Sequence, residues 1–210
     1  MKEKNIVDFY VLCNKLKDVV RTGWQDWRVN RFRVESIAEH IYGTQMLAIC
    51  MWSEFNYDID IKKVILMLAV HELEETVIGD LTEFMIDAKE KEKLGHKAVK
   101  DILSKLNHGY DIEQLVIEFD EKSTLEAKFA FWCDKLECNI QAKIYDEENC
   151  VDLNNQEGNK TAKNEKVKSM LDNGLSWSTT WIDYGIERAG FDENFTKINN
   201  YVRDNQIKNK

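Results

Sequence analysis

The sequence predicts an all-α protein. Its 210 residues contain no proline and only nine glycines, and its apolar residues recur at intervals of three and four, which is the period of helices. No segment shows the alternation of apolar and polar residues that is typical of a strand. A chain of this length predicts one domain with a substantial apolar core.

Two amphipathic helices separated by a basic loop are predicted for the N-terminal part. The first covers about residues 5–20. The second covers about 36–55, because Ser36 followed three residues later by Glu39 forms the capping-box pattern. The loop between them is the most basic short stretch of the chain, with Arg21, Arg28, Arg31 and Arg33.

Two further helices are predicted before residue 110. Asp58 or Asp60 can cap a third helix, which runs through an apolar segment and ends at Gly79, where glycine supplies the left-handed stop. Residues 81–106 form a highly charged amphipathic pattern, with a break near Gly95.

In the second half of the chain, the sequence predicts a short helix over residues 112–121 and a long one over 125–145. Residues 146–164 are rich in Asp, Asn, Glu, Gln and Lys, which favours an exposed, mobile loop. We expect residues 1–148 to form the domain that carries the chemistry and 149–210 to pack on the same domain. The remaining elements are helices at 165–172, 178–189 and 192–205, with Trp177, Trp181 and Tyr184 as docking residues.

Composition excludes several classes of function. The formal charge is −9 and the pI is near 5.1, which argues against a partner made of nucleic acid, because phosphate backbones are bound by clustered Lys and Arg. No apolar stretch approaches the roughly 20 residues of a membrane span, and the N-terminus does not resemble a secretory signal. Five cysteines without CxxC pairing predict reduced thiols and a cytoplasmic location.

A cluster of polar residues directly follows the apolar stretch that ends at Val70. It contains His71, Glu72, Glu74 and Glu75. Charges beside a core cost several kcal/mol each unless they are paired or bind a metal, so this cluster favours a cation site. The simpler alternative is the solvated end of a helix beside a structural histidine.

Asp134 and His40 are two further inward-facing candidates. Asp134 has Ala130, Phe131 and Cys138 as helical neighbours, so its carboxylate points toward apolar surroundings. His40 has a similar setting, although a lone histidine is more often structural. Imidazole and carboxylate ligands together suit one divalent ion such as Mn, Co, Fe, Ni or Zn.

The order His40, His71-Glu72 and Asp134 resembles the H…HD…D signature of the HD-domain metal-dependent phosphohydrolases. The resemblance covers about residues 5–148 and is specific to the branch with the bacterial 5′-deoxynucleotidases and the eukaryotic HD-domain-containing protein 2. One departure is that Glu72 stands where the family has Asp. The matching motifs are Arg21-Thr-Gly-Trp24, Glu35-Ser-Ile-Ala-Glu-His40, His71-x3-Glu75-x3-Gly79-Asp80-Leu81 and Ser123-Thr-Leu-Glu-Ala-Lys-Phe129-x4-Asp134.

This resemblance implies an HD-domain helical bundle with additional C-terminal helices, and it assigns roles to residues near the metal. Glu75 positions or deprotonates the attacking water, and Asp80, followed by Leu81 and Thr82, contacts the sugar of a nucleotide. Arg21, beside Trp24, matches the arginine that orients the phosphate. Because the spacing from Trp24 to His40 is longer than in the family, Arg28 or Arg31 are alternatives for that role.

The expected activity is release of phosphate from nucleoside or deoxynucleoside 5′-monophosphates by a homodimer, as in the related enzymes. Other phosphoester substrates are a nucleoside triphosphate, an alarmone or a cyclic dinucleotide. A different class of protein, supported by Glu72, is a catalytically silent module that senses a nucleotide. A di-iron bundle is disfavoured because paired Glu-x-x-His motifs are absent from the sequence. His96 and His108 are expected to be surface residues.

Overall fold

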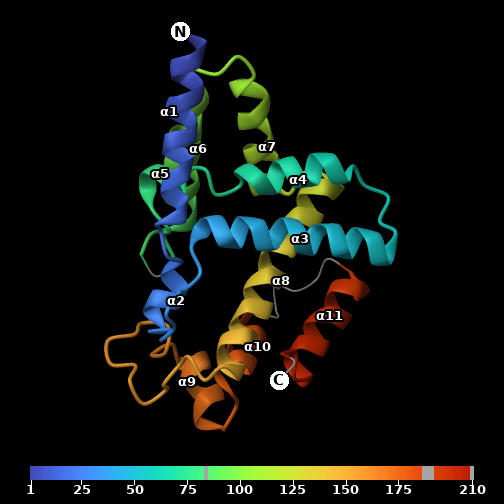
Figure 1. The fold of residues 1–210 in the computed structure, drawn as a ribbon. Helices are drawn as coiled ribbons and strands as arrows, with labels where there is room; N and C mark the ends of the chain where they lie inside the picture. The colour runs from blue at the N-terminus through green and yellow to red at the C-terminus, as the bar shows by residue number, and fades with distance from the viewer. Residues whose placement is uncertain (83–84, 186–191, 209–210) are drawn as a thin grey trace. The chain divides into compact units, whose positions relative to one another are not determined.

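The computed structural model describes residues 1–82, 85–185 and 192–208, and this part of the chain is all-α (Figure 1). Apart from one isolated bridge between Val20 and Ser36, it contains no strand pairing. No described helix is both long and apolar enough to cross a membrane. The prediction of an all-α fold is therefore confirmed. The chain divides into two compact units, the first made of Met1–Thr22 and Glu35–Phe131 and the second of Gly23–Val34 and Trp132–Lys210.

The first unit is built mainly from helices of the N-terminal half of the chain. Within it, α3 packs against α4, α7 packs against both α4 and α6, and α5 packs against α6. A buried apolar cluster joins α6 and α7 and includes Leu73, Val99, Leu103 and Val116. The helices are α1 (Lys2–Asn14), α3 (Ile37–Phe55), α4 (Ile61–Val70), α5 (Glu75–Ile78), α6 (Ala88–Leu103) and α7 (Gly109–Glu121), with a 3-10 turn at Lys15–Lys17.

Polar caps fix the starts of the two helices that carry the site. The Ser36 hydroxyl accepts a hydrogen bond from the amide of Glu39, and the Glu39 carboxylate accepts one from the amide of Ser36, so the predicted capping box is confirmed. Asp60, rather than Asp58, caps α4, because its carboxylate accepts from the amides of residues 62 and 63. His40 lies in the first turns of α3, one turn after the Ser36 cap.

The predicted third helix is interrupted, which corrects the sequence interpretation. α4 ends at Val70, and residues 71–74 form turns before α5 begins at Glu75. In these turns the amide of Leu73 donates to the carbonyl of Val70, and that of Glu75 to Glu72, so each bond spans three residues. Residues 61–78 contain no proline or glycine, so the sequence carries no signal for this break. The tighter winding changes the directions of the side chains in the polar cluster.

Other boundaries also differ from the predictions, since α1 ends at Asn14 rather than near residue 20 and α7 begins at Gly109 rather than 112. α6 begins at Ala88 after the cap Asp87, and not at 81. It also continues through Gly95, where a break is predicted. Gly95 serves close packing instead, because a Cβ there would lie 3.2 Å from Cγ of Glu74. In addition, residues 22–26 of the predicted loop form a short helix, α2 (Thr22–Asp26).

A second glycine contact yields a prediction about stability. A Cβ on Gly109, the first residue of α7, would lie 2.0 Å from the carbonyl oxygen of Leu103, and backbone cannot rotate away as a side chain can. Gly109→Ala is therefore expected to lower the free energy of unfolding by about 1–3 kcal/mol. Urea denaturation measures this. Gly185→Ala is the matched control, because its Cβ would meet no atom of the described residues within 4 Å, and equal stability of the two variants would contradict the prediction.

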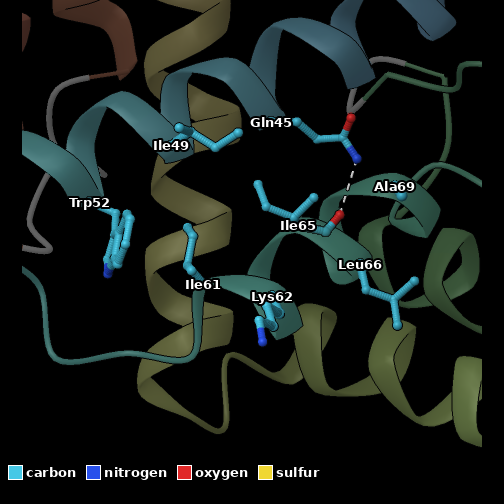
Figure 2. A pocket seen from close by; sticks show the side chains of 8 residues that line it. All are labelled: Gln45, Ile49, Trp52, Ile61, Lys62, Ile65, Leu66 and Ala69. Carbon is cyan, nitrogen blue, oxygen red and sulfur yellow. Dashed lines mark hydrogen bonds between the residues drawn. The ribbon is translucent and has the colours of Figure 1, made fainter.

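An apolar groove of about 500 Å³ opens between α3 and α4 (Figure 2). Trp52 and Ile49 line it from α3, and Ile61 and Leu66 from α4. The amide of Gln45 crosses it to donate to the carbonyl of Ile65 at 3.1 Å. Among the described residues that line the groove there is no histidine, cysteine or carboxylate, so it offers no metal ligand.

The second unit is organised around aromatic rings. Trp24 stacks on Trp181 with ring centroids 4.8 Å apart and meets the edges of Tyr145 and Trp177. Trp177, Trp181 and Tyr184 all belong to this cluster, so their prediction as docking residues is confirmed. The expected end of a helix at 189 lies outside the described residues. The helices are α8 (Leu125–Glu147), which begins in the first unit, α9 (Glu165–Asp172), α10 (Trp177–Gly185) and α11 (Glu193–Asp204).

The polar loop after α8 is irregular, as predicted, but it is anchored by specific hydrogen bonds. The Arg28 guanidinium donates to the backbone and side-chain oxygens of Asn155 and to the carbonyl of Glu157. The Gln156 amide donates to the carbonyl of Trp27. Arg28 has a left-handed backbone with φ of 53°, which costs energy for a residue with a Cβ. These contacts give Arg28 a structural role within the second unit.

Candidate active site

Two buried imidazoles face each other across α3 and α4. His40, on α3, is 0% exposed, and His71, directly after α4, is 3% exposed. Their ring centroids lie 5.7 Å apart. His71 Nδ1 is 2.8 Å from the carbonyl oxygen of Leu68, an acceptor, so Nδ1 carries the proton and Nε2 presents its lone pair. This tautomer suits a metal ligand.

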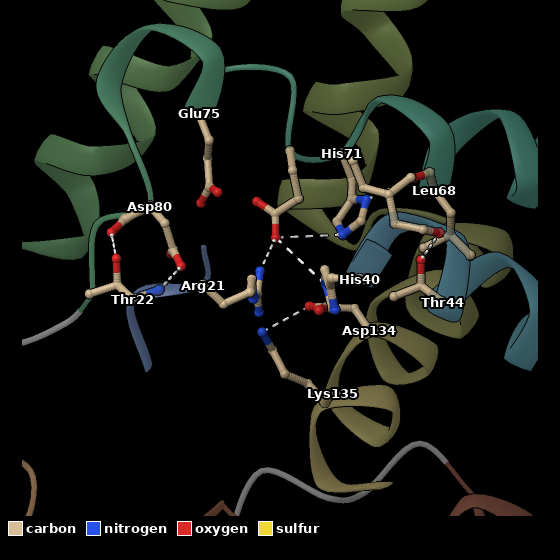
Figure 3. A network of polar contacts seen from close by, with 12 residues as sticks. Arg21, Thr22, His40, Thr44, Leu68, His71, Glu75, Asp80, Asp134 and Lys135 are labelled. Atoms are coloured by element: carbon tan, nitrogen blue, oxygen red, sulfur yellow. Dashed lines mark hydrogen bonds and ion pairs between the residues drawn. The ribbon is translucent and has the colours of Figure 1, made fainter. Parts of the chain in front are cut away.

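Glu72 extends its carboxylate toward both rings. Its Oε1 lies 3.8 Å from His40 Nε2 and 3.7 Å from His71 Nε2, and the ligand atoms of the three residues lie within 4.8 Å of one another (Figure 3). Two imidazole nitrogens and one carboxylate oxygen, buried and convergent, form a donor set suited to a borderline divalent cation. The residues therefore fit the predicted metal, and the longer side chain of Glu72 still reaches the two histidines.

Arg21 contacts the same carboxylate oxygen. Its guanidinium Nη1 is 2.9 Å from Glu72 Oε1, and its side chain is largely buried. The backbone amide of Arg21 donates to the carbonyl of Glu35, which fixes this segment beside the start of α3. A guanidinium beside these candidate metal ligands is suited to bind a phosphate oxygen. Arg28 and Arg31, the alternatives for the phosphate-binding role, have partners in the second unit. Arg28 binds the polar loop and Arg31 pairs with Glu148.

Asp80 joins the Arg21 segment to the loop after α5. Its Oδ2 accepts a hydrogen bond of 2.6 Å from the amide of Thr22, and its carbonyl accepts one of 2.7 Å from the Thr22 hydroxyl. Gly79, with φ of 74°, allows the turn that delivers Asp80. Asp80 therefore holds the chain next to Arg21. Leu81 and Thr82 follow it and are half-buried, and their contact with substrate stays a prediction.

Glu75 and Glu74 add negative charge to this cluster. Glu75 is 2% exposed, and its Oε1 lies 3.4 Å from Nζ of Lys91. Burial, followed by repulsion from Glu72 and Asp80, raises the pKa of Glu75 to about 11, while burial and the Glu72 carboxylate raise that of Glu74 to about 8. A divalent cation nearby favours the ionised carboxylates and opposes these shifts.

Asp134 and Trp24 belong to the second unit. Asp134, on α8, is 4% exposed, and its Oδ2 lies 2.8 Å from Nζ of Lys135. The burial predicted from its helical neighbours is confirmed. Trp24 is 1% exposed and its ring lies in the aromatic cluster. Little of the ring is accessible, and contact of Trp24 with substrate stays a prediction.

The chain matches a family model described as an HD domain, over residues 13–172. It belongs to the HD-domain family. Among curated proteins, it is 33% identical to a Dictyostelium discoideum protein named 5′-deoxynucleotidase HDDC2, over 69% of this chain and 79% of that one. A Xenopus laevis protein of the same name is 31% identical, over 69% and 71%. The fold is similar to that of the PH0347 protein from Pyrococcus horikoshii OT3, with a TM-score of 0.67, 24% identity and coverage of 94% and 98%.

Three contacts of this HD-domain chain could not be found from its sequence. The Thr22–Asp80 and Lys91–Glu75 pairs join distant segments, and no local pattern indicates them. His96, expected at the surface, is half-buried and its Nε2 lies 2.7 Å from Asp120 Oδ2, so it links α6 to α7. His108 is exposed, as predicted.

Proposed function

We propose that this chain is a metal-dependent 5′-nucleotidase that releases phosphate from nucleoside or deoxynucleoside 5′-monophosphates. The observation that carries this proposal is the convergence of His40 Nε2, His71 Nε2 and Glu72 Oε1, with the Arg21 guanidinium on that same oxygen. A cation site with an adjacent phosphate-binding group is what phosphomonoester hydrolysis needs. The names of the Dictyostelium and Xenopus relatives support this choice of substrate.

Asp134 is our proposal for the fourth metal ligand. Two observations support it: its order along the chain after the His71-Glu72 pair, and its burial as a carboxylate on α8. Four protein ligands leave positions for water and substrate on an ion of higher coordination number.

When bound, a divalent cation acts as a Lewis acid toward a phosphoryl oxygen and toward water. Arg21 would bind an equatorial phosphate oxygen and stabilise the charge that develops there. Glu75 would accept a hydrogen bond from the attacking water and orient it in line with the departing 5′ oxygen. Asp80, positioned by its contact with Thr22, would bind the sugar, with Leu81 and Thr82 beside it. The products are a nucleoside and inorganic phosphate.

A phosphate-release assay tests this proposal. The protein is loaded separately with Mn, Co, Fe, Ni and Zn and assayed with ribo- and deoxyribonucleoside 5′-monophosphates, the 3′-monophosphates, a triphosphate, an alarmone and a cyclic dinucleotide. We expect release from 5′-monophosphates with at least one metal and little from the other compounds. Activity confined to a triphosphate or a cyclic dinucleotide would contradict the proposed substrate class.

A second candidate is a silent module that binds a nucleotide without hydrolysing it. The Arg21–Glu72 ion pair favours it, because the arginine already neutralises a carboxylate that would bind metal. Isothermal titration of the metal-loaded protein with a deoxynucleoside monophosphate, alongside the release assay, separates the two functions. Binding without release supports the silent module.

The identity of the metal, the homodimer and the cytoplasmic location remain predictions. The five described cysteines are free, which is consistent with a reducing compartment. Size-exclusion chromatography with light scattering measures the oligomeric state, and a mass equal to one chain of 24.7 kDa would contradict the dimer.

A further inference from the structure

Lys91, on α6, places its ammonium group among the carboxylates of the candidate site. Its Nζ lies 3.4 Å from Glu75 Oε1, and about two-thirds of its side chain is buried. Burial opposes the charge, but Glu75, Glu72 and other carboxylates raise the pKa of Lys91 above its usual value. Removing part of an ammonium group's hydration costs energy, which a contact with a carboxylate offsets. The contact with Glu75 accounts for its position.

The packing of α6 brings Lys91 to this place. Gly95 lies one turn later on the same face of the helix, since residues four apart share a face. A Cβ at Gly95 would meet Glu74 Cγ at 3.2 Å, so the glycine lets α6 approach Glu74 and the start of α5, where Glu75 lies. The face of α6 that carries Lys91 and Gly95 therefore packs against Glu74 and Glu75.

The two oxygens of Glu75 have different surroundings. Oε1 contacts Lys91, whereas Oε2 is buried and has no hydrogen-bond partner in the described part of the chain. We propose that Lys91 is a positioning residue, which holds Oε1 of Glu75 so that Oε2 can accept a hydrogen bond from the attacking water. This inference rests on the proposed function, because it assigns the partner of the residue that orients the nucleophile. The rival role for Lys91 is direct binding of the substrate phosphate.

Kinetics of Lys91→Met separate these roles. We expect kcat to fall roughly tenfold to a hundredfold, because a misplaced acceptor loses part of the contribution of general base catalysis, while KM stays unchanged. Lys91→Arg should restore most of kcat. Lys93→Met is the matched control, since Lys93 is exposed on the same helix and its loss removes the same charge. We expect this control to match the unaltered protein.

A double-variant cycle with Glu75→Gln shows through which residue Lys91 acts. If Lys91 works through Glu75, Lys91→Met has no further effect on kcat when Glu75 is already replaced. Two results together would overturn the proposal in favour of phosphate binding: Lys91→Met raises KM, and the losses of turnover caused by Lys91→Met and by Glu75→Gln multiply in the double variant. Elemental analysis of each variant checks that metal content is retained, because loss of the metal would assign Lys91 to metal binding instead.

The control measurements distinguish failure of this inference from failure of the proposed function. Full turnover by Lys91→Met, with an active unaltered protein, overturns the role of Lys91 alone. No phosphate release from the metal-loaded unaltered protein contradicts the proposed function, and the role of Lys91 is overturned with it. Circular dichroism checks the fold, and Lys91→Gln, which keeps a polar head, provides the same test if the methionine variant is unstable.

Discussion

His71→Ala is expected to abolish metal binding and phosphate release. The substitution removes an Nε2 atom that converges with His40 and Glu72, and the ligands that remain bind a divalent ion much more weakly at neutral pH. Loss of the metal removes several kcal/mol of transition-state stabilisation, so turnover should fall about a thousandfold or more. Elemental analysis and a phosphate-release assay on the same preparation measure both effects.

The matched control for this variant is His108→Ala. His108 is exposed at the start of α7 and pairs only with its neighbour Asp111 among the described contacts. It should keep full metal content and activity. Circular dichroism establishes that His71→Ala is folded. A folded His71→Ala protein with a full complement of metal would remove His71 from the ligand set and contradict the proposed site.

Arg21→Ala is expected to lower kcat/KM roughly a hundredfold, because the phosphate loses a charged donor at the position where negative charge develops. The metal content should stay close to that of the unaltered protein, since Arg21 contacts Glu72 but is not itself a ligand. Steady-state kinetics with a deoxynucleoside 5′-monophosphate provide the measurement. A lysine at this position should recover only part of the activity, because it offers a single point charge rather than a planar fork.

Arg28→Ala and Arg31→Ala are the controls for this experiment. Both arginines are alternatives for the phosphate-binding role by sequence, but the structure pairs Arg28 with Asn155 and Arg31 with Glu148. Each variant should keep kcat/KM within about threefold, since each arginine is held by partners in its own unit. A hundredfold loss in Arg28→Ala or Arg31→Ala, with Arg21→Ala unaffected, would reassign the phosphate contact.

The sequence predicts those features of the site that depend on local periodicity. Helical neighbours indicate the burial of Asp134 and His40, and the structure confirms that burial. The capping box at Ser36 predicts the start of α3 and places His40 in its first turns. These inferences succeed because each depends on residues within one helical turn.

The sequence does not predict the features of the site that depend on contacts between distant segments. The interruption at 71–74 has no glycine or proline signal, and only packing against neighbouring helices selects it over a continued helix. The Thr22–Asp80 contact spans 58 residues and the Lys91–Glu75 contact spans 16. The sequence likewise does not predict the role of Gly95. A glycine within a charged helical pattern indicates a helix break, and its close packing on Glu74 is known only from the structure.

The most direct test of the central claim is a titration of metal-free protein with Mn, in which bound metal and phosphate release from a deoxynucleoside 5′-monophosphate are measured on the same samples. A site made from His40, His71, Glu72 and Asp134 predicts that release rises in proportion to bound metal and levels off near one equivalent per chain. Metal bound at one equivalent with no release of phosphate would contradict a nucleotidase and identify a binding module instead.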